Sequence, residues 1–167
     1  MIDRAVIWQP ADLARLKPIT GSNPVRPVDS IVIHHTGGGV QETPQGIHAY
    51  HLRPESQGGA GYGGCGYHFL IDRDFRTWRG RPLWARGAHC KSNNSGRIGI
   101  ALMGNYNDAA PAAPMVRMAM GLIAQLQALY GDLPVFPHYS MAGSVTDCPG
   151  RACVQAFVKE GLEWAAM

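Results

Sequence analysis

At 167 residues the chain has the length of one domain, and 46% hydrophobic with 16% charged residues is the composition of an ordinary globular protein. The formal net charge of +3 comes without any run of Lys or Arg, which argues against a nucleic-acid-binding protein, although a mild positive charge suits an anionic polymer. The 21 Gly and 12 Pro predict long, shaped loops, and loops carry function more often than cores do.

No segment approaches the ~20 consecutive apolar residues that a membrane-spanning helix needs, so we expect no membrane span. The first ten residues contain no apolar stretch long enough for a signal peptide, which predicts synthesis in a cytoplasm without a secretion signal. The four cysteines, at positions 65, 90, 148 and 153, form neither a CxxC pair nor an evident disulfide framework. Whether Cys65 pairs with Cys90 stays open at this point.

The first 28 residues are mixed in character and interrupted by Pro, with one short helical pattern from Ala11 to Leu16. We interpret residues 1–28 as an N-terminal strap that lies over a single domain of residues 29–167. Nothing in this segment has the pattern of a catalytic site.

A strand and a helix are predicted after the strap. The apolar, β-branched run from Ile31 to Ile33 predicts a buried strand, which ends at His34 because residues 37–39 are all Gly. Thr43 as N-cap and Pro44 at the first helical position predict a helix to about residue 52. Residues 54–66 are rich in Gly and have the composition of a flexible rim.

Further strands are predicted in the middle of the chain. Residues 66–72 combine aromatic and branched side chains, which predicts the second strand, and residues 73–76 predict a hairpin turn into residues 77–79. Residues 98–104 are apolar on both faces, so they are expected to form a third strand in the centre of the sheet.

The last third of the chain predicts two helices around a short strand. Apolar residues recur at helical spacing over residues 111–130, where Gly131 ends the helix, and residues 134–137 form a strand that leads into His138. The fold class that follows is α/β, a single domain with a central mixed β-sheet flanked by helices. A closing amphipathic helix is expected after Pro149 and Gly150, marked by Val154, Phe157, Val158, Leu162 and Trp164.

Three side chains that commonly bind metals lie where a predicted strand gives way to a loop. His34 ends the first strand, His138 follows the last short strand, and Cys148 lies in a loop rich in turn-forming residues. Two His and one Cys are three protein ligands, which in a zinc site leave the fourth position open for water. Each has a structural alternative, the histidines as polar strand ends and Cys148 as a small buried side chain, but their combination favours a metal site.

Five motifs occur in the order and rough spacing of a known enzyme family. They are Ile31-Val-Ile-His-His-Thr36, Gly66-Tyr-His-Phe-Leu-Ile71, Gly87-Ala-His89, Ile98-Gly-Ile100 followed by Met103-Gly-Asn-Tyr106, and His138 with Thr146-Asp-Cys-Pro-Gly150. The chain resembles the zinc-dependent N-acetylmuramoyl-L-alanine amidases of type 2, which include phage amidase lysozymes and the peptidoglycan recognition proteins. The resemblance extends from about residue 29 to about residue 160 and implies the amidase fold.

The resemblance implies a zinc ion bound by His34, His138 and Cys148. The last two ligands are ten residues apart, which is wider than in the phage lysozymes and matches relatives that carry Asp at the last position. Asp and Cys each bring one negative charge beside two neutral imidazoles, so the metal keeps a net positive charge with either. The implied reaction is hydrolysis of the amide between the lactyl group of N-acetylmuramic acid and L-alanine in peptidoglycan.

The resemblance also assigns residues around the metal. Tyr67 matches a tyrosine that orients the water or stabilises the developing oxyanion, and Thr146 matches a Lys or Thr that stabilises the tetrahedral intermediate. Another branch carries a general-base Glu on the third strand, where this chain has Ala101, and this departure favours Tyr67 as the assisting residue. The residues expected to line the substrate groove are His89, Asn93 and Asn94.

The other histidines have no assigned role in the site. Strand alternation predicts that His35 and His68 point away from the motif residues beside them, and we interpret both as structural. His48 and His51 lie on the first predicted helix, and the sequence names no partner for either.

The leading interpretation is a monomeric zinc amidase that acts on peptidoglycan or its muropeptides, with no nucleic-acid partner. The expected absence of a secretion signal favours a phage or prophage endolysin that reaches the cell wall after release, with an effector or a wall-recycling enzyme as other settings. Two other functions stay open. One is a peptidoglycan-binding module without catalysis, and the other is a metal-free cysteine peptidase with Cys65 or Cys148 as nucleophile.

Overall fold

A computed structural model gives the fold of residues 27–166. Nearly all of the predicted strap, including its helical pattern, lies outside these described residues. Five strands form one mixed sheet in the order β3-β2-β4-β1-β5, in which β2, β4, β1 and β5 are parallel and β3 is antiparallel to β2. The strands are β1 (Ser30–His35), β2 (Phe69–Ile71), β3 (Thr77–Arg79), β4 (Arg97–Leu102) and β5 (Val135–Pro137).

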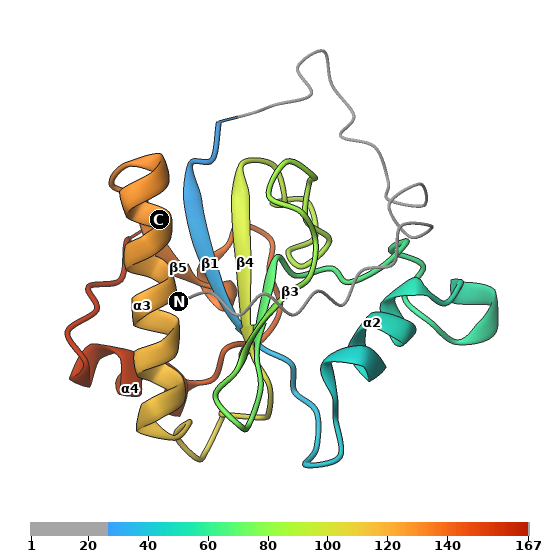
Figure 1. Cartoon of the computed structure of the whole chain (residues 1–167), viewed down its shortest axis with the longest axis horizontal. Coiled ribbons are helices and arrows are strands. Elements are labelled where there is room, and N and C mark those ends of the chain that lie inside the picture. The colour runs from blue at the N-terminus through green and yellow to red at the C-terminus, as the bar shows by residue number, and fades with distance from the viewer. Residues whose placement is uncertain (1–26, 167) are drawn as a thin grey trace.

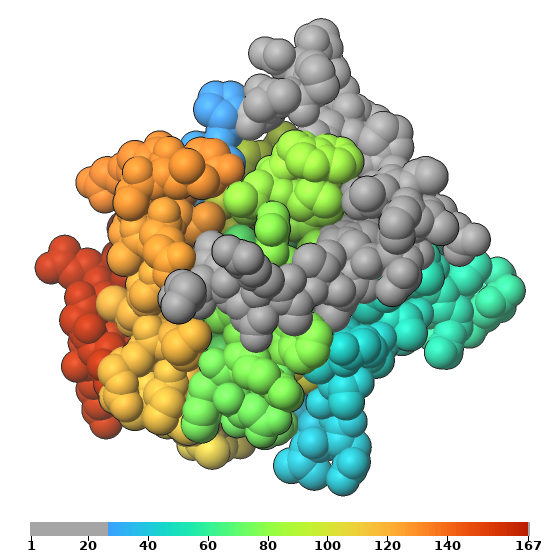
Figure 2. Space-filling view, in the orientation of Figure 1, coloured from blue at the N-terminus to red at the C-terminus, as the bar shows by residue number. Residues whose placement is uncertain are grey.

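Helices lie on both flanks of the sheet, which confirms the predicted α/β fold with β4 at its centre. Figure 1 shows α3 and α4 on one flank and α2 on the other, and Figure 2 shows that residues of α2 and the following loop project as a lobe. Within residues 27–166, no helix is both long enough and apolar enough to cross a membrane. The helices are α2 (Pro44–Leu52), α3 (Ala113–Tyr130) and α4 (Arg151–Lys159), with short 3-10 helices η1 (Glu55–Gln57) and η2 (His138–Ser140).

Alternation along β1 separates the main hydrophobic core from the opposite face of the sheet. Ile31 and Ile33 are fully buried in one large cluster together with apolar residues of α3 and α4. Val32 lies in a smaller cluster, and by alternation His34 shares its face. His34 therefore projects away from the main core.

The predicted signals at the helix ends are confirmed. The Thr43 hydroxyl accepts a hydrogen bond from the N–H of Gly46 at 3.0 Å, and Pro44 occupies the first helical position. At the end of α3, the N–H of Gly131 donates to the carbonyl of Gln127, and the φ of Gly131 is +96°, a value that favours glycine.

The closing helix is shorter than the apolar pattern predicted. It ends at Lys159, and Gly161 turns the chain with a φ of +90°. Leu162 and Trp164 lie beyond the helix and still pack against the core, with the Trp164 ring 5.5 Å from the ring of Phe157. The helical interpretation of these last two apolar residues is wrong, because they reach the core from an irregular segment.

The predicted hairpin turn is organised by one buried carboxylate. Asp72 Oδ1 accepts hydrogen bonds from the backbone N–H groups of Asp74 and Arg76, both at 2.9 Å. Its Oδ2 accepts from Trp78 Nε1 at 2.7 Å and from Arg76 Nε at 2.9 Å. Burial raises the pKa of Asp72, but the hydrogen bonds from Trp78 and Arg76 and the Arg76 charge outweigh it and lower the pKa below its ordinary value.

We expect Asp72→Asn to lower the free energy of unfolding by about 1–3 kcal/mol at neutral pH. The amide NH2 of Asn would replace one carboxylate oxygen, and each of these oxygens accepts two hydrogen bonds. A carboxyl group whose pKa is lower in the folded state stabilises the protein above its unfolded pKa of about 3.9, and loses this contribution as the pH falls through the lower folded value. The difference between wild type and variant should therefore shrink below about pH 4, as followed by denaturant unfolding. Asp74→Asn is the control, because Asp74 forms an exposed ion pair with Arg76.

Candidate metal centre

The two predicted histidine ligands lie at the same edge of the sheet. Because β1 and β5 are parallel neighbours, their carboxyl ends meet there, with Ile33 of β1 opposite Pro137 of β5. His34 is the next residue of β1, His138 is the first residue after β5, and their ring centroids are 4.4 Å apart. The carboxyl edge of a parallel sheet is the usual place for a ligand site in α/β proteins.

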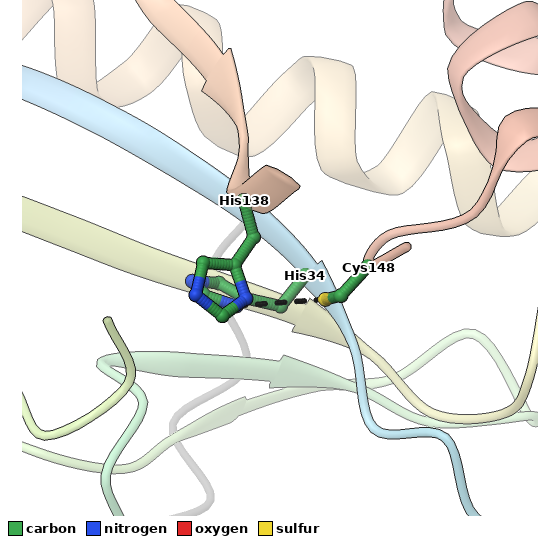
Figure 3. A group of neighbouring side chains, drawn as sticks. All are labelled: His34, His138 and Cys148. Atoms are coloured by element: carbon green, nitrogen blue, oxygen red, sulfur yellow. Dashed lines mark hydrogen bonds between the residues drawn. The ribbon is translucent and has the colours of Figure 1, made fainter. Parts of the chain in front are cut away.

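Cys148 reaches this edge from the loop between η2 and α4. The N–H of Tyr139, the residue after His138, donates to the Cys148 carbonyl at 2.8 Å, and the N–H of His35 donates to Cys148 Sγ at 3.3 Å. The first hydrogen bond joins the two ends of the ten-residue span between the last two ligands, and the second joins Cys148 to the end of β1. Figure 3 shows His34, His138 and Cys148 pointing toward one another from the three segments.

The geometry of the three side chains fits a tetrahedral zinc site. One candidate ligand atom from each residue lies within 4.8 Å of the other two, and His34 Nδ1 is 3.7 Å from Cys148 Sγ. Zn–N bonds of about 2.0–2.1 Å and a Zn–S bond of about 2.3 Å at a tetrahedral angle place N and S about 3.5 Å apart. The structure therefore brings together the ligand set that the sequence predicted.

Burial keeps the two imidazoles neutral, which is the form that binds metals. The pKa of His34 is lowered well below its ordinary value, chiefly by burial and then by the neighbouring His89 and His138. The pKa of His138 is lowered as well, by burial and then by His35. Both histidines thus present unprotonated ring nitrogens at neutral pH.

Burial has the opposite effect on the acidic groups of the site. It raises the pKa of the Cys148 thiol to about 12, although the hydrogen bond from the His35 backbone acts against this shift. The pKa of Tyr67 is also raised, by burial first and then by Cys148. A divalent cation is the element that would stabilise a Cys148 thiolate in this environment.

Tyr67 and Thr146 lie beside the three candidate ligands. The Tyr67 ring centroid is 5.3 Å from that of His34. Thr146 Oγ1 accepts a hydrogen bond from the Cys148 N–H at 3.1 Å, so this residue shapes the turn that carries the thiol. Its hydroxyl hydrogen can still be donated to another group.

A cavity of about 720 Å³ opens next to the candidate metal centre. Of the predicted groove residues, His89 and Asn94 line it, together with His138 and Thr146. Asn94 Oδ1 accepts hydrogen bonds from the N–H groups of His89 and Cys90, both at 2.9 Å. Asn93 instead donates from Nδ2 to the carbonyls of Lys91 and Ala142.

The other histidines act in backbone hydrogen bonds. Nδ1 of His35 accepts from the Tyr106 N–H, and Nδ1 of His48 and of His51 accepts from the N–H groups of residues 65 and 66. His68 precedes β2, so strand alternation does not govern it, and its ring contacts that of His89 at 5.6 Å between centroids. All four cysteines are free, so Cys65 and Cys90 do not pair.

Arg81 is a residue of this region that the sequence did not single out. Its side chain is almost fully buried, and its guanidinium donates to the carbonyls of Cys65, Arg86 and Tyr62 at 2.8–2.9 Å. Burial lowers its pKa to about 10, so the group stays charged at neutral pH. Arg81 also lines the cavity, where its charge favours anionic groups.

The family of the chain follows from comparison with known proteins. Residues 24–151 match the family model of the N-acetylmuramoyl-L-alanine amidases. The chain belongs to this amidase family. The candidate metal centre of His34, His138 and Cys148 therefore occurs in a chain whose family is described by the predicted activity.

Relatives of the chain are both recognition proteins and amidases. It is 35% identical over 136 residues to a peptidoglycan-recognition protein of Drosophila simulans, an alignment that covers 75% of this chain and 70% of the relative. Among solved structures it is similar to the N-acetylmuramoyl-L-alanine amidase LysC from Clostridium intestinale, with 30% identity, a TM-score of 0.67 and coverage of 84% and 89%. Bumblebee PGRP-SA is similar at 28% identity, with a TM-score of 0.72 and coverage of 84% and 86%.

We expect Asn94→Ala to destabilise this amidase-family domain by about 1–3 kcal/mol, because two backbone N–H groups beside the cavity lose their acceptor. Asn94→Asp keeps the acceptor oxygen and should retain most of the stability. Denaturant unfolding of both variants measures the effect, with Asn93→Ala as a control that removes only exposed hydrogen bonds. Equal stability of the two alanine variants would contradict the role assigned to Asn94.

Proposed function

We propose that the protein is a zinc-dependent amidase that hydrolyses the bond between the lactyl group of N-acetylmuramic acid and L-alanine in peptidoglycan. The observation that carries the proposal is the convergence of His34, His138 and Cys148 ligand atoms within 4.8 Å, beside Tyr67 and a cavity lined by His138 and Thr146. Water adds to the amide carbonyl, the C–N bond breaks, and the products are a lactyl carboxylate and the free amine of L-alanine.

The chemistry of this reaction divides between the metal and the protein side chains. A bound zinc ion would supply a Lewis acid that polarises the carbonyl and lowers the pKa of a coordinated water to about 7. Because its pKa is raised, Tyr67 keeps its proton at every physiological pH. Its role is therefore to donate an O–H hydrogen bond to the oxyanion that develops on the carbonyl oxygen, and it does not act as a base.

Thr146 is the second donor that we assign to the transition state. It lines the cavity beside His138, and its hydroxyl keeps a hydrogen to donate after accepting from the Cys148 N–H. No carboxylate comes from the centre of β4, because Ala101 occupies the position where another branch of the family carries Glu, and it is fully buried. The side-chain contribution to oxyanion stabilisation, beside that of a bound metal ion, thus comes from neutral hydroxyl donors.

Digestion of purified peptidoglycan tests the proposal directly. Mass spectrometry should detect stem peptides whose N-terminal residue is L-alanine with a free amine. It should also detect glycan chains whose lactyl groups carry free carboxylates. A chelator should abolish the activity, and added zinc should restore it. Release of other fragments, or activity that a chelator does not affect, would exclude the zinc amidase and favour a different hydrolase.

We expect zinc binding to release about one proton, because the Cys148 thiol has a pKa of about 12 and must ionise, whereas the histidines are already neutral. The apparent affinity should therefore rise about tenfold per pH unit between pH 7 and pH 9. An indicator dye and zinc titration measure both quantities.

Two substitutions of Cys148 make this prediction specific. Cys148→Ser should lose zinc and activity together, since serine does not supply an ionised ligand. Cys148→Asp should bind zinc without releasing a proton, because the carboxylate is already ionised at neutral pH. Full zinc content in Cys148→Ser would show that the thiol is not a ligand.

For Tyr67→Phe we expect zinc binding to persist and turnover to fall by ~10²-fold, the effect of removing one oxyanion donor. The fall should appear in kcat, because the hydrogen bond strengthens only in the transition state. Zinc content and steady-state kinetics on a muropeptide measure the two effects. A fully active Tyr67→Phe protein would exclude this role for the hydroxyl.

The second candidate function is recognition of peptidoglycan without catalysis, which is favoured by the several relatives named as peptidoglycan recognition proteins. Against it stand the complete set of three candidate ligands and the adjacent tyrosine. A cysteine peptidase is disfavoured because Cys65 is fully buried and the pKa of its thiol, like that of Cys148, is raised to about 12. Binding to peptidoglycan without any release of L-alanine would favour the recognition protein.

For the biological setting we propose a phage or prophage endolysin that acts as a monomer on the cell wall. Support comes from the likeness to an endolysin amidase, LysCS from Clostridium intestinale, at 30% identity and a TM-score of 0.67. Lysis of intact cells by added protein, compared with digestion of isolated peptidoglycan, tests this setting.

A further inference from the structure

A second histidine lies directly behind the candidate ligand His34. His34 Nε2 and His89 Nδ1 are 2.9 Å apart, and the two rings meet edge to face with centroids 4.9 Å apart. His34 is only 1% exposed, so water does not compete for this hydrogen bond. One nitrogen of the pair must donate a proton and the other must accept it.

The far side of the His89 ring fixes the direction of that hydrogen bond. His89 Nε2 lies 3.4 Å from the carbonyl oxygen of Arg97, and a carbonyl can only accept, so Nε2 carries the proton. In a neutral imidazole Nδ1 is then an acceptor, and His34 must donate to it from Nε2. The remaining nitrogen of His34, Nδ1, is left with its lone pair directed at the side where Cys148 Sγ lies 3.7 Å away.

The ring of His89 is held in a slot that only glycines permit. A Cβ atom on Gly87 would lie 2.4 Å from His89 Cδ2, and one on Gly99 would lie 2.5 Å from the same atom. Asn94 fixes the backbone at His89 and at the next residue, because its side-chain oxygen accepts hydrogen bonds from the N–H groups of residues 89 and 90. The orientation of the ring is thus set by packing as well as by hydrogen bonds.

We propose that His89 is a positioning residue, which holds His34 in the Nε2–H tautomer and at the rotation that aims its Nδ1 lone pair at the metal position. The inference rests on the proposed function for the metal itself, but the ordering of the two rings belongs to the protein alone. Opposite tautomers would place a proton on His34 Nδ1, between the ring and Cys148, and would block metal binding. The two hydrogen bonds that connect the Arg97 carbonyl to His89 and His89 to His34 exclude that arrangement.

This role differs from the groove-lining role that the sequence resemblance implied for His89. Both ring nitrogens are engaged within the protein, one with His34 and the other with the Arg97 carbonyl. A substrate in the cavity would therefore meet the ring without displacing either hydrogen bond. The dependence of metal affinity on His89 should accordingly be visible with no substrate present.

The test uses two variants of nearly equal size, His89→Leu and His89→Asn, of which only Asn keeps an acceptor close to the position of Nδ1. We expect zinc binding in the absence of substrate to weaken by about 10- to 100-fold in His89→Leu and to stay near wild type in His89→Asn. Competition with a chromophoric chelator measures the affinities, and circular dichroism of the metal-free proteins controls for folding. Equal affinities of His89→Leu and wild type would overturn the inference.

Nitrogen-15 NMR of histidine-labelled, metal-free wild type decides the tautomer independently of metal binding. The Nε2–H form of His34 is expected in wild type and in His89→Asn, with a mixture of tautomers in His89→Leu. An Nδ1–H form of His34 in wild type would overturn the inference even if zinc binds. Failure of wild type to bind zinc would instead overturn the proposed function, and the observed tautomer would still support or exclude the positioning role.

Discussion

The parallel pairing of β1 with β4 and β5 is the constraint on which the site depends. Parallel neighbours bring their carboxyl ends to one edge, and the register of Ile33 opposite Pro137 sets His34 beside His138. A shift of β1 by one residue would exchange the faces of Ile33 and His34, placing an imidazole in the main core and an isoleucine at the metal position. Burial of Ile31 and Ile33 therefore stabilises the fold and also fixes the position of the candidate ligand His34 on the opposite face of the sheet.

One physical cause, burial, gives every group of the site its working protonation state. It lowers the pKa values of His34 and His138 and raises those of Cys148 and Tyr67, so that in the metal-free protein all four are neutral. Neutral imidazoles offer lone pairs and a neutral tyrosine offers a proton. The thiol alone must change its state when a cation enters, which couples metal binding to the release of a proton.

The fold could be predicted from sequence where local patterns and packing agree, as they do for the β-branched run of β1, the Thr43 cap and the Gly131 stop. The three candidate ligands could also be predicted from the sequence, because each lies at a strand end or in a loop rich in turn-forming residues. The helical interpretation of Trp164 is wrong because its spacing continues the helical period, whereas the helix ends at Lys159 and the chain turns at Gly161. The apolar spacing alone does not reveal that turn. The contact of His89 with His34 joins residues 55 apart and has no local pattern at all.

The cavity and the candidate metal ligands of this chain come largely from different segments. The cavity, with buried Arg81 and the Asn94-supported loop, is built largely from the segment between β3 and β4, whereas two of the candidate ligands come from the end of β5 and the loop before α4. Loss of the thiol at position 148 would leave the cavity wall and its charge in place. In our proposal, binding of peptidoglycan in the cavity and its hydrolysis at the metal centre therefore depend on different residues, and hydrolysis requires Cys148 beside the two oriented imidazoles.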